Sequence, residues 1–149
     1  MDGSGARFRK LSVLRVRGDR FAAFNGPRAS EHSLEQRAFL PLEKLRRPMT
    51  GGAMLHPWPL RRFDLVHGWN RVPLGPTPFV VGFEWHIPLS WEHTPRSFNM
   101  LMDALVSDRC RGIIAASQAA ATITEHRHVN DPRRDALMRK MTVRLANVD

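Results

Sequence analysis

Residues 79–117, FVVGFEWHIPLSWEHTPRSFNMLMDALVSDRCRGIIAAS, contain the pattern that decides the fold. An apolar run at Phe79–Phe83 opens the stretch, and a second apolar run at Gly112–Ala116 closes it. Both runs are apolar on successive residues, as strands buried on two faces of a parallel sheet are. Between them, Phe98–Val106 has apolar residues at i, i+3, i+4, i+7 and i+8, which predicts an amphipathic helix that begins after Thr94. The stretch therefore predicts a strand–helix–strand unit.

The same alternation continues on both sides of this unit. Upstream, Phe63–His67 (FDLVH) predicts another short buried strand. Downstream, Ser117 is the predicted N-cap of an alanine-rich helix, a further helix is predicted over Asp131–Met141, and Thr142–Leu145 is predicted to be a last strand. Strands alternating with crossover helices predict the α/β class, with residues 1–149 forming one Rossmann-like three-layer domain around a mainly parallel sheet.

The N-terminal part of the chain gives weaker signals. Leu11–Arg17 contains enough branched residues for a strand, and Phe21–Phe24 would continue it as a hairpin. The apolar residues of Leu34–Leu45 follow helical spacing, although a proline interrupts them. The prolines and glycines of Pro48–Pro59 predict a loop. Met1–Ala6 is small and polar, which predicts disorder.

The composition excludes several classes of protein. The 149 residues (17.0 kDa) suit one domain, and 42% hydrophobic with 25% charged residues excludes wholesale disorder. No run approaches the roughly 18 apolar residues of a membrane-spanning helix, and the first residues lack the apolar run of a secretory signal. The single cysteine, Cys110, cannot form an internal disulfide or a zinc ribbon, and His126 and His128 lack the spacing of a metal site. We therefore expect a cytoplasmic protein without a bound metal.

Positive charge is concentrated in the first part of the chain. The sequence has 23 Lys and Arg against 14 Asp and Glu, a net charge of +9, and residues 1–62 carry most of the excess. An arginine-rich surface attracts phosphates, anionic lipid headgroups or nucleic acid, and the alternative is an ordinary solvated face. Only Phe8 lies among the arginines, and no recognition helix or RNA-binding motif is present, which argues against nucleic acid as a partner.

Polar residues follow three of the predicted strands. His67 closes one strand, Glu84 the next and Ser117 a third, so they should converge where ligands bind to parallel sheets. A hydrogen-bonded histidine and a helix cap are the structural alternatives for His67 and Ser117. A carboxylate directly after a buried strand is costly to desolvate, which favours a functional role for Glu84. Aromatic or polar side chains are expected at the same edge: Trp69, Asn70, Trp85, His86 and Trp91.

Four blocks of sequence resemble a known enzyme family. The runs Asp64–His67, Pro78–Glu84 and Cys110–Ser117, in this order and spacing, resemble the N-terminal domain of group 1 (family 4) glycosyltransferases, which have the GT-B fold. Lys140–Asp149 is similar to the last strand of that domain and the segment leading to the hinge. The resemblance covers residues 63–149 and implies one Rossmann-like half of a two-domain enzyme.

The resemblance implies transfer of a sugar from a nucleotide-sugar donor to an acceptor, with retained anomeric configuration and no cofactor or obligatory metal. His67 matches a histidine that faces the family's cleft, and Glu84 stands where many members have a cleft histidine. Both residue types can orient or deprotonate a hydroxyl, so both are candidate catalytic residues. The acceptor would be a lipid, a polysaccharide or a small molecule. The candidate acceptor-binding residues are Trp69, Asn70, Trp85, His86 and Ser117.

Two features of the family have no counterpart in the 149 residues: the glycine-rich loop after the first strand and the donor-binding domain with its pair of glutamates. The resemblance therefore implies a chain that is inactive alone and needs a C-terminal domain or a partner chain. The cleft-facing surface would then be exposed, which predicts self-association. The alternative is a non-catalytic binding module whose basic N-terminal half contacts an anionic protein surface or the inner face of a membrane.

Overall fold

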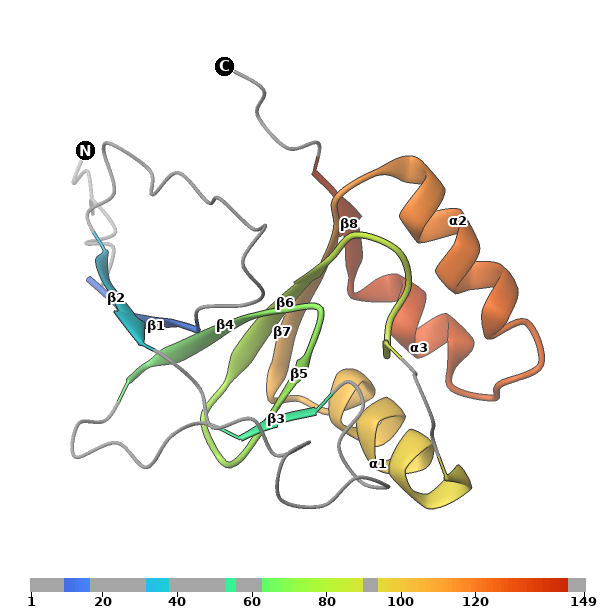
Figure 1. Cartoon of the computed structure of the whole chain (residues 1–149), viewed down its shortest axis with the longest axis horizontal. Coiled ribbons are helices and arrows are strands. Elements are labelled where there is room, and N and C mark those ends of the chain that lie inside the picture. Colours follow the sequence, from blue (N-terminus) through green and yellow to red (C-terminus); the bar gives the residue numbers. More distant parts are fainter. Residues whose placement is uncertain (1–9, 17–31, 38–52, 56–62, 90–93, 145–149) are drawn as a thin grey trace, which may run out of the picture.

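The computed structural model describes residues 10–16, 32–37, 53–55, 63–89 and 94–144 (Figure 1). These residues form a six-stranded sheet of order β2-β1-β4-β6-β7-β8, in which all neighbouring strands are parallel. Its strands are β1 (Ser12–Val16), β2 (Ser33–Arg37), β4 (Leu65–Trp69), β6 (Phe79–Phe83), β7 (Cys110–Ala115) and β8 (Met141–Val143). A parallel sheet with flanking helices confirms the predicted α/β, Rossmann-like class.

The helices of the C-terminal half begin where their capping residues predict. Helix α1 (Pro95–Val106) starts after Thr94, whose hydroxyl accepts the Ser97 N–H at 3.3 Å. Helix α2 (Gln118–Arg127) starts after Ser117, whose hydroxyl accepts the N–H of its third residue at 3.1 Å. Helix α3 (Arg134–Arg139) is shorter than the predicted helix at both ends, because its first three predicted residues form a turn and its last, Met141, is the first residue of β8.

The N-terminal predictions are partly wrong. The strand predicted at Leu11–Arg17 is confirmed as β1. The residues 34–37, predicted as part of a helix, belong to the strand β2, because that segment pairs residue by residue with β1. The predicted loop at Pro48–Pro59 contains the short strand β3 (Ala53–Leu55), which pairs in parallel with β5 (Val72–Leu74). The predicted hairpin at 21–24 and the polar segment at 1–6 lie outside the described residues.

Strand β4 lies two residues further along the chain than predicted, at Leu65–Trp69. The preceding Asp64 is held outside the strand, because its carboxylate accepts hydrogen bonds from the N–H and the hydroxyl of Ser12 at 2.9 and 3.0 Å. The pairing with β6 then continues to Trp69, opposite Gly82. His67 therefore lies in the middle of β4, and the prediction that it closes the strand is wrong.

One face of the sheet carries the hydrophobic core. Alternate residues of β6 (Phe79, Val81 and Phe83) are fully buried, and they pack with Leu101 and Leu105 of α1. Helix α1 contacts β5, β7 and α3, and α2 contacts β7 and β8 (Figure 1). The residues that alternate with the core positions, such as Val80 and Ile114, are only half-buried and lie on the opposite face of the sheet.

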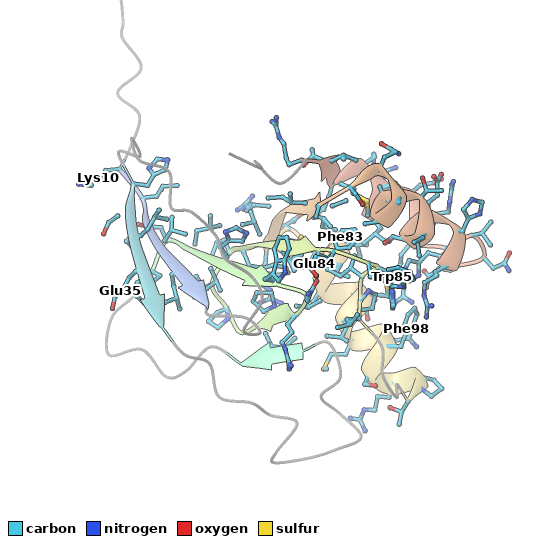
Figure 2. The ribbon with its side chains drawn as sticks, turned by 45° about the horizontal axis from the view of Figure 1, so that its top comes forward. Lys10, Glu35, Phe83, Glu84, Trp85 and Phe98 are labelled. Atoms are coloured by element: carbon cyan, nitrogen blue, oxygen red, sulfur yellow. The ribbon has the colours of Figure 1, made fainter. Side chains whose placement is uncertain are left out.

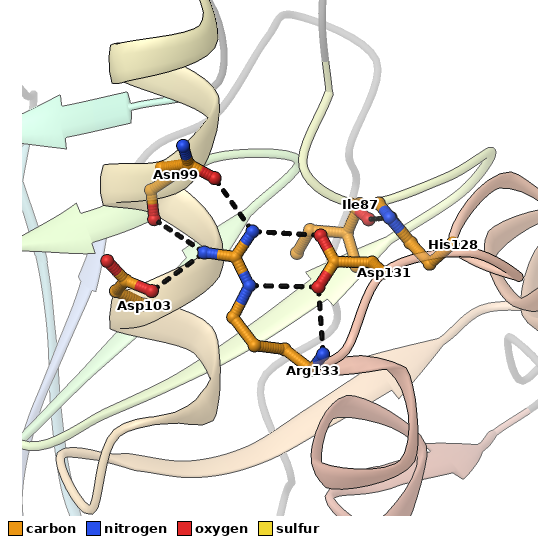
Figure 3. A network of polar contacts seen from close by, with 6 residues as sticks. All are labelled: Ile87, Asn99, Asp103, His128, Asp131 and Arg133. Atoms are coloured by element: carbon orange, nitrogen blue, oxygen red, sulfur yellow. Dashed lines mark hydrogen bonds and ion pairs between the residues drawn. The ribbon is translucent and has the colours of Figure 1, made fainter.

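Helices α1 and α3 are joined by a single guanidinium group (Figure 3). Arg133 forms a two-pronged pair with Asp131 at 2.8 and 2.9 Å, and the same group reaches Asp103 at 2.7 Å and Asn99 at 2.8 Å on α1. The hydrogen bonds from Arg133 lower the pKa of the Asp131 carboxyl group. This planar fork fixes how α3 lies against α1.

Candidate functional site

The ends of three neighbouring strands form the candidate site. Asn70 follows β4, Glu84 follows β6, and Ser117 lies two residues beyond β7. Hydrogen bonds that continue the sheet, from the Asn70 N–H to the Gly82 carbonyl at 2.7 Å and from the Ala116 N–H to the Phe83 carbonyl at 2.9 Å, hold these ends side by side. The carboxyl edge of the sheet therefore places Asn70, Glu84 and Ser117 at the ends of adjacent strands, with Asn70 in the place that the sequence predicted for His67.

Glu84 is exposed, but its carboxylate is held by a neighbouring strand (Figure 2). One carboxylate oxygen accepts a hydrogen bond from the indole N–H of Trp69 at 3.0 Å. The Glu84 backbone N–H donates to the side-chain oxygen of Asn70 at 3.1 Å. The negative charge therefore faces solvent at a fixed place on the edge, where it can accept a proton or a hydrogen bond from a bound hydroxyl group.

The Trp69 ring lies directly over Gly82 of the next strand. A Cβ atom at Gly82 would come within 2.3 Å of two carbons of that ring, much closer than atoms can approach. Only glycine therefore lets the indole lie across β6 and reach Glu84. Sequence reasoning missed this contact, although the glycine inside the apolar run FVVGF was its one visible signal.

Asn70 turns the chain at the end of β4. Its φ of 55° lies in the left-handed region, which asparagine tolerates better than other side chains. This conformation places the amide oxygen of Asn70 against the Glu84 N–H. Asn70 therefore fixes the start of the loop that carries Glu84.

The next two candidates occupy different environments. Trp85 is 62% exposed and presents its indole to solvent beside Glu84 (Figure 2). His86, predicted as an acceptor-binding residue, is only 7% exposed. The structure therefore leaves Trp85 accessible to a ligand and buries His86. Trp91 lies outside the described residues.

His67 and Ser117 have clear structural positions. His67 is half-buried and pairs with Val80 of β6. It lies on the same face of the sheet as Trp69, about 7 Å further from the carboxyl edge along β4. The Ser117 hydroxyl caps α2, as the structural interpretation predicts. Its position next to the Glu84 strand still allows the hydroxyl to donate a hydrogen bond toward the edge.

The loop after Glu84 is anchored by a buried histidine. The ring of His128, at the end of α2, donates from Nε2 to the Ile87 carbonyl at 2.8 Å (Figure 3). The same ring stacks on Phe98 of α1 with ring centroids 5.8 Å apart. Burial lowers the pKa of His128 below its ordinary value of 6.5. The neutral ring therefore fixes the segment that carries Glu84 and Trp85.

This histidine makes stability depend on pH. The unfolded chain protonates His128 near pH 6.5 and the folded chain only at lower pH, so the free energy of unfolding is highest above pH 6.5 and falls as the pH drops below it. Each unit by which the pKa is lowered corresponds to a loss of about 1.4 kcal/mol. Urea unfolding between pH 8 and pH 5 measures this loss. We expect His128→Gln to weaken the pH dependence and His126→Gln, on the exposed side of α2, to leave it unchanged; equal slopes for both would contradict the assignment.

The structure also bears on metal binding, on membrane-spanning helices and on the reactivity of Cys110. In the parts of the chain that the structure describes, no three His, Cys, Asp or Glu side chains come together as metal ligands, and no helix has the length and apolar character needed to cross a bilayer. Cys110 is buried, and burial raises the pKa of its thiol. A raised pKa keeps the thiol protonated, which suits a core position rather than a nucleophile.

Comparison of the chain with protein-family models, with curated proteins and with solved structures finds no match.

Proposed function

We propose that this chain is the acceptor-side domain of a retaining, metal-independent glycosyltransferase, which acts together with a nucleotide-sugar-binding domain. The observation that carries the proposal is the exposed Glu84 carboxylate, held in place by the Trp69 indole at the carboxyl edge of a parallel sheet. Ligands of open α/β sheets bind at this edge. The sequence resemblance adds the class of reaction.

In the proposed reaction, the bond between the anomeric carbon of the sugar and the nucleotide phosphate breaks, and a bond to an acceptor hydroxyl oxygen forms. Glu84 accepts a hydrogen bond from that hydroxyl through the carboxylate oxygen that does not contact Trp69. This contact orients the acceptor and stabilises the positive charge that develops on its oxygen, before the proton moves to the departing phosphate.

The exposed indole of Trp85 supports a sugar-bearing or otherwise flat acceptor beside Glu84. An aromatic face packs well against the C–H face of a sugar ring while the ring hydroxyls remain available for hydrogen bonds. His67 lies further back along β4, and Ser117 lies at the end of the neighbouring strand. Both side chains offer additional hydrogen bonds to the hydroxyl groups of the acceptor.

The test joins the chain through its carboxyl end to the donor-binding domain of a glycosyltransferase from the resembled family. Transfer of labelled sugar from that domain's nucleotide sugar is measured with lipid, polysaccharide and small-molecule acceptors. We expect transfer by the joined protein, and a rate about 100-fold lower with Glu84→Gln, because general acid–base and orientation effects of this kind contribute factors of that order.

Asp135→Asn is the matched control, because this carboxylate is 76% exposed on α3, away from the carboxyl edge. It should change the rate less than twofold. An equal rate for wild type and Glu84→Gln would remove Glu84 from the site. Absence of transfer with every acceptor, together with an acceptor-dependent change in tryptophan fluorescence, would favour the non-catalytic binding module instead.

A further inference from the structure

The sheet face opposite the core contains a groove lined by positive charge. It has a volume of about 620 Å³, within the range of small-molecule sites. Its floor is formed by Val80, Gly112 and Ile114, which alternate along β6 and β7 with the core residues. Its polar walls are Asp108, Arg111, Arg139, Lys140, Thr142 and Arg144.

In the described part of the chain, the arginines of the groove form no ion pairs with acidic side chains. Arg111, Arg139 and Arg144 are exposed, and within the described residues none of these three arginines has a carboxylate at ion-pair distance. Arg133 and Arg134, by contrast, pair with aspartate or glutamate side chains outside the groove. The groove therefore has a positive potential.

A fourth cation is fixed in place. The Lys140 ammonium group donates to the carbonyl oxygens of Ser107 and Cys110 at 2.5 and 3.0 Å. These neutral partners hold the group without cancelling its charge. Asp108 is the one carboxylate among the lining residues, so four positive charges stand against one negative charge.

The floor of the groove is open at Gly112. A Cβ atom there would meet a single described atom within 4 Å, a methyl carbon of Val80 at 3.8 Å, which is ordinary contact. The φ of Gly112 is also not positive, so neither packing against the described residues nor backbone conformation requires glycine at this position. A small residue here leaves room for a ligand above the sheet.

We propose that this groove binds a small ligand that carries two or more phosphate groups. Arginine presents its N–H groups in a planar fork that matches phosphate oxygens, and several unneutralised arginines around one hollow suit several phosphate charges. A membrane surface fits less well, because the apolar residues of the groove form its half-buried floor and do not protrude toward lipid. The groove uses none of the carboxyl-edge residues, so this proposal stands or falls independently of the glycosyltransferase proposal.

The test is titration calorimetry of the full chain at low ionic strength with two probes, inorganic pyrophosphate and adenosine diphosphate. We expect binding of one equivalent, weakened at least tenfold by the double substitution Arg111→Gln and Arg144→Gln. Gly112→Leu, which fills the floor and keeps every charge, should weaken binding at least tenfold as well. Tighter binding of adenosine diphosphate would show that the floor takes the nucleoside, and equal affinities would assign the site to the phosphates alone; either result supports the proposal.

The control is Arg96→Gln on α1, which removes the same charge outside the groove and should change the affinity less than twofold. Circular dichroism checks that each variant is folded, and Gly112→Ala, which fits the available space, should bind as the wild type does. Equal losses for the Arg96 and groove variants, or undiminished binding by Gly112→Leu, would overturn the proposal. It would also be overturned if phosphatidylglycerol vesicles or random single-stranded DNA bound to Gly112→Leu as to the wild type while neither small probe bound.

Discussion

Replacing Gly82 by alanine is expected to destabilise the protein by about 3 kcal/mol and to release the Glu84 carboxylate from its place. The added methyl group would lie 2.3 Å from two ring carbons of Trp69, so the indole must leave the surface of β6. Overpacking of this kind costs about 1–3 kcal/mol, and loss of the indole hydrogen bond to a charged group adds about 1.5–3 kcal/mol at a buried position and less at this exposed one. Urea unfolding and the emission maximum of the tryptophans measure the two effects.

The neighbouring strand offers a matched control for this substitution. Gly112 lies in β7, and its nearest atom to an added Cβ is 3.8 Å away. Gly112→Ala should therefore change the free energy of unfolding by less than about 1 kcal/mol, in the stabilising direction, because glycine is the poorer strand residue. Similar losses at both glycines would mean that glycine loss itself, and not the indole, is responsible. Adding Trp69→Val to Gly82→Ala should recover most of the stability but not the orientation of Glu84.

A loss of about 3–5 kcal/mol is expected for Phe79→Ala, because Phe79 is one of the two largest fully buried side chains among the described core residues. Phe79 is fully buried in β6, between β4 and β7, and the Arg109 guanidinium lies 5.8 Å from its ring centroid. The substitution removes the ring, leaves a cavity in the core and ends this cation–π contact. Because domains of this size are stable by about 5–15 kcal/mol, the variant would be close to unfolding at 37 °C.

Thermal and urea unfolding measure this loss, and Phe79→Leu is the conservative control. Leucine keeps most of the buried volume, so it should cost less than about 2 kcal/mol. Equal losses for the two variants would show that the aromatic ring and its contact with Arg109 matter more than the cavity. A loss below 1 kcal/mol for Phe79→Ala would contradict the placement of this residue in the core.

Local patterns were sufficient to predict the C-terminal half of the fold. The apolar runs of β6 and β7 and the helix between them depend on residues close in the chain, and so do the caps Thr94 and Ser117. Strand β2 could not be predicted in this way. Its sequence, SLEQR, is polar, and its extended conformation comes from pairing with β1, which lies about twenty residues earlier in the chain.

The candidate site was predictable only in part, because some of its contacts also depend on pairing between strands. Glu84 follows an apolar run directly, so its place at the strand end could be read from the sequence. The contact between Trp69 and Gly82 depends on the register of two strands, and register is set by tertiary pairing. The depth of His67 follows from the same register. The groove arginines come from β7, from the end of α3 and from beyond β8, and only the folded sheet brings them together.

The charges that flank β8 also bear on how the sheet ends. Within the described residues β8 has a neighbour on one side only, and such an edge can pair with the same edge of a second molecule. If two copies paired there in antiparallel fashion, centred on Thr142, Lys140 of each would stand opposite Arg144 of the other. Like charges directly across a strand pair are destabilising. The strand therefore carries its own protection against growth of the sheet from one molecule into the next.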